Sequence, residues 1–150
     1  MAGILVGLAL TGCGGSSSST PSLSAFKSGF AADKVQFRRL GTDLQTEITG
    51  AASKTDAQLA GELSTLSGRA KQQAAQLAKL SPPDKYKTGL NQLVANFNSV
   101  STDLNTMSVA AGKHEVSAAK AATKTLLQDA AKVKASDTAL TSALHLPATG

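Results

Sequence analysis

The sequence predicts an all-α fold, an antiparallel four-helix bundle formed by residues 22–150. Only 3% of the 150 residues are aromatic, so Leu, Val and Ala must supply most of the core, and this favours helices. From Ser22 onward the apolar residues alternate between spacings of three and four, as in helices that pack at shallow angles. After Pro21, proline occurs only at positions 82, 83 and 147, which permits long helices.

Four apolar stripes define the expected helices in chain order. The first contains Phe26, Phe30, Phe37, Leu40, Leu44 and Ile48. The second contains Leu59, Leu63, Leu66, Ala70, Leu77 and Leu80. The third contains Tyr86, Leu90, Leu93, Phe97, Val100, Leu104 and Met107. The fourth contains Val116, Ala119, Leu126, Ala130, Val133, Leu140 and Leu144. Each stripe predicts one amphipathic helix with its apolar side in the core.

Signals for helix ends separate these stripes. Residues 50–54 interrupt the first stripe, and Thr55 and Gln58 can form a capping box at the start of the second helix. The run Ser81-Pro82-Pro83-Asp84 separates the second helix from the third. Gly112 is expected to end the third helix as a left-handed cap, residues 113–115 to open the fourth, and Pro147 to stop it. The connections between helices are short, so neighbouring helices are expected to run antiparallel.

A weak internal repeat appears at an offset of 60 residues. The corresponding pairs are Phe26 and Tyr86, Phe30 and Leu90, Phe37 and Phe97, Leu40 and Val100, Thr42 and Thr102, Asp43 and Asp103, Leu44 and Leu104, Thr46 and Thr106, Leu66 and Leu126, and Ala70 and Ala130. The repeat suggests two related helical hairpins. The alternative, that amphipathic helices align through composition alone, is equally compatible with the sequence.

Composition excludes several classes of protein and site. A single Cys cannot form an internal disulfide framework or a Cys-rich zinc site, and two His leave little for a His-rich metal centre. The 41% apolar fraction is too high for a wholly disordered chain. No apolar run reaches the ~18 residues that a permanent membrane span needs. We therefore expect one domain without a metal or cofactor.

The N-terminal segment carries the most specific signal. Residues 1–10 are uncharged and mostly apolar, and Leu10, Thr11, Gly12 and Cys13 follow the pattern Leu, small residue, Gly or Ala, Cys. This resembles the lipobox of bacterial lipoproteins. The resemblance implies a signal peptide over residues 1–12, a lipid on the Cys13 thiol and a mature chain beginning at Cys13. Signal peptides ordinarily start with Lys or Arg, which residues 1–10 lack, so we expect the natural start to lie upstream.

A tether is expected between the anchor and the bundle. After Cys13, residues 14–21 read Gly-Gly-Ser-Ser-Ser-Ser-Thr-Pro, a composition typical of flexible coils, with a reach of about 15 Å. This start resembles lipoproteins of high-GC Gram-positive bacteria. We therefore expect the protein at the extracytoplasmic face of the cell membrane, held by its lipid.

The net charge of +5 suggests an anionic partner for the helical bundle, which we call the head. Lys113, Lys120 and Lys124 are predicted to share one face of the fourth helix and to contact an anionic surface or wall polymer. The alternative is an ordinary solvated face. Nucleic acid is not expected as a partner, because the protein lies outside the cell and aromatic stacking groups are scarce.

Few residues offer catalytic chemistry. His114 and His145 are more than 30 residues apart, outside any recognisable motif, and are expected at solvated helix ends. Asp43 and Asp103 are expected as boundary carboxylates, although equivalent places in two hairpins would also suit a shared ligand. Gln73, Thr123 and Asp137 fall near core positions and are expected to be partly exposed.

These observations predict a non-enzymatic interaction module of the cell envelope. The alternatives are a structural or surface-blocking lipoprotein, such as one that excludes phage, and an accessory subunit of an envelope enzyme. The last five residues, Leu146-Pro147-Ala148-Thr149-Gly150, match the sortase signal Leu-Pro-x-Thr-Gly. They lack the apolar span and basic tail that normally follow, so we interpret the match as chance or as the end of a truncated sequence.

Overall fold

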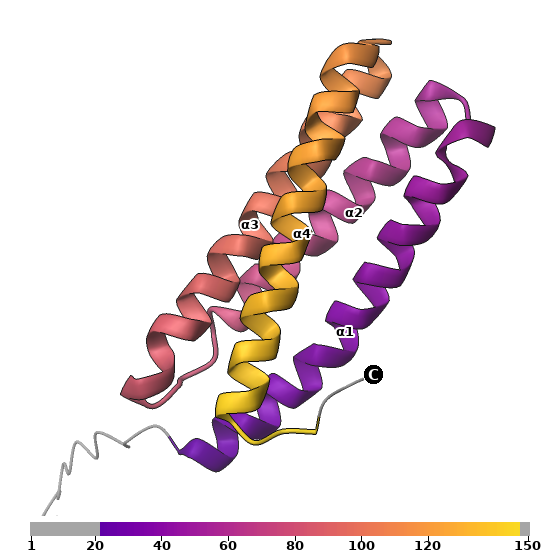
Figure 1. The fold of residues 1–150 in the computed structure, drawn as a ribbon. Helices are drawn as coiled ribbons and strands as arrows, with labels where there is room; N and C mark the ends of the chain where they lie inside the picture. The colour runs from indigo at the N-terminus through magenta and orange to yellow at the C-terminus, as the bar shows by residue number, and fades with distance from the viewer. Residues whose placement is uncertain (1–21, 148–150) are drawn as a thin grey trace, which may run out of the picture.

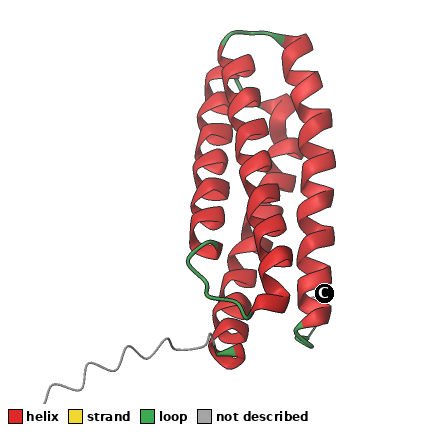
Figure 2. Cartoon of the chain, turned by 90° about the vertical axis from the view of Figure 1, so that its left-hand side faces the viewer, coloured by secondary structure: helices red, strands yellow, loops and turns green. Residues whose placement is uncertain are grey.

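The structure, a computed structural model, describes residues 22–147 and confirms the four-helix bundle. The helices are α1 (Leu23–Gly50), α2 (Asp56–Leu77), α3 (Asp84–Gly112) and α4 (Val116–Ala143), with a short 3₁₀ turn, η1 (Ala51–Ser53), after α1. They run alternately up and down, so that the α1–α2 and α3–α4 connections share one end (Figure 1). The helices stand side by side in one elongated body, and the described residues contain no strand (Figure 2). The predicted signal peptide and tether, residues 1–21, lie outside the described residues.

Two of the predicted helix starts are confirmed in detail. The Thr55 side chain accepts a hydrogen bond from the Gln58 backbone, and the Gln58 side chain accepts one from the Thr55 backbone, which completes the capping box of α2. Helix α3 starts at Asp84 directly after Pro83. Pro83 occupies the N-cap position, and Asp84 lies in the first turn, where the positive end of the helix dipole favours an anion.

The predicted cap of α3 is wrong in its position. Gly112 is still helical, and His114 takes the left-handed conformation with φ of 58°. The Glu115 amide then donates to the Ala110 carbonyl, the bond that closes a Schellman turn. Helix α4 ends the same way, with His145 at φ of 52°. Its last residue is Ala143 and its C-cap is Leu144, so the helix ends through its own cap before Pro147 can stop it.

The apolar stripes form one core that runs the length of the bundle. The largest fully buried side chains are Phe26, Phe30, Leu63, Leu77, Leu93, Leu104, Leu126 and Leu144, all within the predicted stripes. The prediction that Val116 lies in the core is wrong: as the first residue of α4, it is 64% exposed. Gln73, expected to be partly exposed, is buried, whereas Thr123 and Asp137 are partly exposed as predicted.

Residues paired by the 60-residue offset meet on the bundle axis. The rings of Phe37 and Phe97 have centroids 4.9 Å apart, and those of Phe26 and Tyr86 lie 5.8 Å apart. Helices α1 and α3 run parallel, so equivalent positions stand at the same height. A pseudo-twofold axis along the bundle would bring such positions together. The arrangement fits two related hairpins, and the duplication stays a prediction.

The four helices do not pack equally. Helix α3 contacts α2 and α4 closely along its length, whereas α1 approaches α2 more sparsely. The close α2–α3 approach is marked by Ser67 and Ser101, each of whose hydroxyls donates to the other's backbone carbonyl, at 2.7 and 2.9 Å. The looser fit of α1 leaves the cavities described below.

Candidate functional sites

An apolar cavity of about 310 Å³ lies between α1 and α4, with α3 as its floor. Its lining comprises Phe37, Arg38, Leu40, Gly41 and Leu44 of α1, Phe97 and Val100 of α3, and Ala130, Val133, Lys134 and Asp137 of α4. The apolar members come from the predicted stripes, so residues expected to fill the core instead line a cavity. The volume is at the lower end of the range for small-molecule sites, about 300–1,000 Å³.

Two of the lining residues have little or no side chain. Gly41 is exposed at the edge of the cavity, and a Cβ added there would meet no heavy atom within 4 Å. Ala130 lines the facing side of α4 with a single methyl group. Larger side chains at either position would fill the space, as they do in a close-packed bundle core.

Charged side chains surround one side of the cavity. Arg38 and Lys134 line it and are exposed, while Asp137 is half-buried. Burial raises the pKa of Asp137, and the Lys34 ammonium and the Thr141 hydroxyl act in the opposite direction. Lys34 itself is buried and donates to Thr141 at 2.7 Å. The cluster joins α1 to α4, and cations outnumber anions there.

A second apolar cavity of about 190 Å³ lies nearer the end of the bundle that carries the α1–α2 connection. It is lined by Glu47, Ile48, Ala51, Leu59, Leu63, Met107, Ala111, Ala119 and Thr123. Glu47 is buried and accepts a hydrogen bond from Lys54 at 2.6 Å, and Lys54 also pairs with Glu62. Burial raises the pKa of Glu47. The ion-paired group of Glu47, Lys54 and Glu62 therefore contains two carboxyl groups and one cation.

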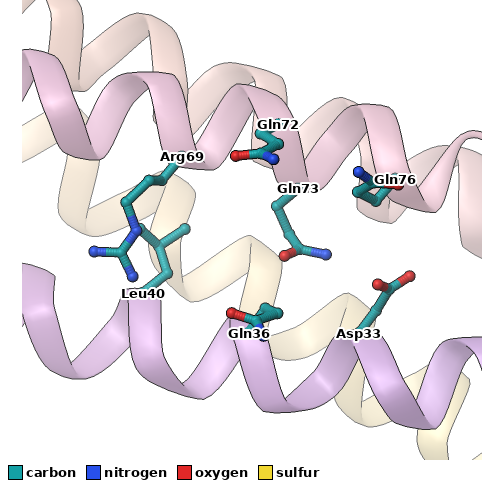
Figure 3. A pocket seen from close by; sticks show the side chains of 7 residues that line it. All are labelled: Asp33, Gln36, Leu40, Arg69, Gln72, Gln73 and Gln76. Carbon is teal, nitrogen blue, oxygen red and sulfur yellow. The ribbon is translucent and has the colours of Figure 1, made fainter.

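A polar cavity of about 290 Å³ separates α1 from α2. Figure 3 shows the amides of Gln72, Gln73 and Gln76 on α2 opposite Gln36 and Asp33 on α1. Burial raises the pKa of Asp33, and the nearby Gln73 amide opposes this rise.

At one end of the same cavity, Arg69 forms an ion pair with Asp43 at 2.6 Å, which links α1 to α2. Among the described residues, the buried Gln73 Nε2 has no hydrogen-bond partner. The lining of this cavity is mostly polar, and Leu40 is its one apolar member.

The other predicted carboxylate, Asp103, has a different neighbour from Asp43. Burial and the nearby Asp129 raise the pKa of Asp103, and Lys132 partly offsets them. Lys132 donates to Asp129 at 2.6 Å. Since Asp43 and Asp103 take part in separate local contacts, the described structure gives them no common site. Among residues 22–147, no group of three or more His, Cys, Asp or Glu side chains could hold a metal ion.

The predicted basic contact residues are all exposed. Lys113 lies in the α3–α4 connection, and Lys120 and Lys124 lie in the first part of α4. They are therefore in the part of the bundle remote from Ser22, where the described chain begins (Figure 1). His114 contacts Asp56 across the same end, and His145 is exposed after α4. The two histidines cap different helices and lie at opposite ends.

The lipobox residues Leu10, Thr11, Gly12 and Cys13 lie outside the described residues, as does the end of the Leu-Pro-x-Thr-Gly match. Its first residue, Leu146, is half-buried against the core. No helix within residues 22–147 is long and apolar enough to cross a membrane.

The sequence indicated the stripes but not the cavities. Gly41, inside the first predicted helix, was the available signal, because a glycine in a helical pattern without a turn often has a packing or functional reason. Comparisons of the chain with protein-family models, curated proteins and solved structures found no match.

Proposed function

We propose that the protein is a lipid-anchored, non-catalytic binding module at the extracytoplasmic face of the cell membrane. The observation that carries the proposal is the match of Leu10, Thr11, Gly12 and Cys13 to the lipobox directly after an apolar stretch. A thiol is the nucleophile that accepts the lipid, and Cys13 is the only Cys in the sequence. The head would supply the binding surface, and the Gly/Ser tether would allow the head to move near the bilayer.

The cavities support binding rather than catalysis. The α1–α4 cavity offers apolar side chains with cations beside it, and the α1–α2 cavity offers amides. Catalysis by acyl or phosphoryl transfer requires a nucleophile next to a base, or donors converging on one reacting atom. The residues that line these two cavities instead suit recognition of a ligand.

Replacement of Cys13 tests the anchor. In the native bacterial host, the wild-type protein is expected in the membrane fraction, and Cys13→Ala is expected to leave it and to lack the lipid mass. Ser16→Ala, a change in the tether with the thiol intact, is the matched control and should remain in the membrane fraction. Membrane retention of Cys13→Ala, together with an unlipidated wild-type mass, would disprove the lipoprotein proposal.

The alternative role is a structural or surface-blocking lipoprotein. Such a protein would carry the same lipid anchor but would not need a specific binding site in its helical bundle. A blocking protein depends on abundance and tolerates changes inside its cavities, whereas a binding module loses its partner when a cavity is filled. Cross-linking in intact cells, compared between the wild type and a cavity-filled variant, distinguishes the two roles.

A further inference from the structure

The α1–α4 cavity is the feature from which the ligand's chemistry can be inferred. Most of its lining is apolar and buried or half-buried, and Gly41 and Ala130 contribute almost no side chain to it. Protein interiors normally pack to the density of organic crystals. A space lined mainly by apolar side chains is therefore suited to an apolar group from outside the chain.

The order of the lining residues along α1 and α4 suits a linear chain. The first cavity extends along α1 from Phe37 to Leu44, and the second lies beyond it, beside Glu47 to Ala51. On α4 the corresponding lining passes from Asp137 to Ala130 and then to Thr123 and Ala119, so both helices place the cavities in line. From Phe37 to Ala51 the helical rise gives about 20 Å, which exceeds one leaflet of a ~30 Å hydrocarbon core.

The volume sets how much of such a chain the first cavity holds. A methylene group takes roughly the volume of one water molecule, about 30 Å³. A cavity of about 310 Å³ therefore accommodates about ten carbons, and a longer chain would extend towards the second cavity.

The charges indicate an anionic head group at one side only. Arg38 and Lys134 are exposed where the first cavity opens, and the buried Lys34 faces Asp137 beside them. These three cations exceed the single carboxylate. The second cavity has Glu47 at its side, with Lys54 and Glu62, and so offers no excess of cations. An anion would therefore sit at the Arg38 side, with its chain directed towards the second cavity.

We propose that the cavity between α1 and α4 binds a single long-chain fatty acid, with its carboxylate at Arg38 and Lys134 and its alkyl chain between the helices. The inference rests on the proposed function in one respect, because the anchor would hold this cavity near a bilayer that contains acyl chains. The binding itself needs only the described head.

The test uses laurate and the full-length chain carrying Cys13→Ala, so that no attached lipid competes for the cavity. Isothermal titration calorimetry below the micellar concentration should give one laurate per chain. Affinity should fall about fourfold for each methylene removed from laurate to octanoate, the factor expected when every methylene is buried. Arg38→Gln and Lys134→Gln should each weaken laurate at least fivefold and leave uncharged 1-dodecanol nearly unchanged.

Filling the cavity is the decisive variant. Ala130→Leu should weaken laurate at least tenfold and raise the thermal unfolding midpoint, because the new side chain occupies the empty space. Gly41→Leu on the facing helix should do the same, which covers the case that one of the variants fails to fold. Ala135→Leu, the same change at an exposed α4 position, is the matched control and should bind laurate normally.

Three results would overturn the inference: no saturable laurate binding, unchanged binding in folded Ala130→Leu and Gly41→Leu, or equal losses of laurate and dodecanol in the Arg38 and Lys134 variants. The proposed function fails by a separate result, namely membrane retention of Cys13→Ala together with an unlipidated wild-type mass. Laurate binding by the Cys13→Ala chain is measured without any anchor.

Discussion

At the scale of single residues, several carboxyl groups lie where helices meet and water is partly excluded. Burial raises the pKa of Asp33, Glu47, Asp103 and Asp137 in the folded protein. A raised carboxyl pKa means that the folded state binds the proton more tightly than the unfolded chain. The stability from this effect is fully present below the unfolded pKa and is lost as the pH rises through the folded pKa.

Asp103→Asn is expected to increase stability at pH 7. The substitution removes a negative charge that lies beside Asp129, and the Asn amide can donate to that carboxylate. Urea unfolding should show a gain of up to about 1 kcal/mol, the scale of interactions between partly exposed charges. The gain should shrink as the pH falls through the raised pKa of Asp103, because the wild-type carboxyl is then protonated too. A gain independent of pH would contradict this explanation.

Lys34→Met is expected to decrease stability. Lys34 is buried, donates to Thr141 and faces Asp137, so its removal leaves a half-buried carboxylate without the opposing charge. The expected loss is about 1–3 kcal/mol in urea unfolding at pH 7. The double variant Lys34→Met with Asp137→Asn should recover part of the loss. Equal losses in the single and double variants would show that the charge on Asp137 is not the cause.

At the scale of helices, local sequence signals determine where each helix starts more reliably than where it ends. The capping box at Thr55 and the prolines before Asp84 are short-range chemistry and were predictable. Gly112 was the expected left-handed cap, yet α3 continues through it and His114 takes that role. The position of a Schellman turn depends on where the helix stops. Contacts with other helices help to decide that point, so the local sequence alone does not predict it.

Thr55→Ala is expected to weaken the start of α2 by about 1 kcal/mol, because the capping box loses its side-chain acceptor. Thermal or urea unfolding followed by circular dichroism measures the change. Thr65→Ala is the matched control: Thr65 is an exposed residue inside α2 whose hydroxyl donates only to the Gly61 carbonyl. A similar loss in both variants would mean that the cap adds nothing specific.

Gly61→Ala and Gly89→Ala should differ. Both glycines lie inside helices, where Ala is favoured by about 1 kcal/mol. A Cβ at Gly61 meets no atom within 4 Å, whereas one at Gly89 lies 2.5 Å from Cδ1 of the buried Leu140. Gly61→Ala should therefore gain about that amount in unfolding free energy, and Gly89→Ala should gain less or lose stability. Equal gains would show that α3 and α4 are not in close contact there.

At the scale of the whole molecule, the apolar stripes were enough to predict the bundle, its order of helices and most of its core. They could not predict the cavities, because periodicity shows which side of a helix is buried and not how closely another helix approaches it. Gln73 illustrates the same limit. It lies near the core-facing side of α2, and the position of α1 decides whether it is buried. The tertiary arrangement therefore determines the candidate sites.

The position of the basic residues has a consequence for membrane contact. Lys113, Lys120 and Lys124 belong to the part of the bundle remote from Ser22, and α1 spans about 40 Å by its helical rise. Under the proposed lipid anchor, the expected tether would reach about 15 Å, which is shorter than this distance. Contact of these lysines with the anchoring bilayer would then require the bundle to lie along the surface rather than to stand on it.

Replacing the three lysines by Gln should weaken binding of the Cys13→Ala chain to anionic vesicles. About 1 kcal/mol per Lys near the surface corresponds to roughly a fivefold loss for each. Vesicle co-sedimentation at low and physiological salt measures it. The control, Gln at the exposed Lys71, Lys79 and Lys85, removes the same charge from another part of the bundle. Equal losses in the two variants would indicate general attraction rather than contact through this face.

The anchor is the central claim, and intact-mass spectrometry of the protein isolated from its native membranes tests it most directly. The account predicts a chain that begins at Cys13 and carries a diacylglyceryl group on that residue's sulfur. A chain that retains residues 1–12, or one that begins at Cys13 with a free thiol, would contradict it.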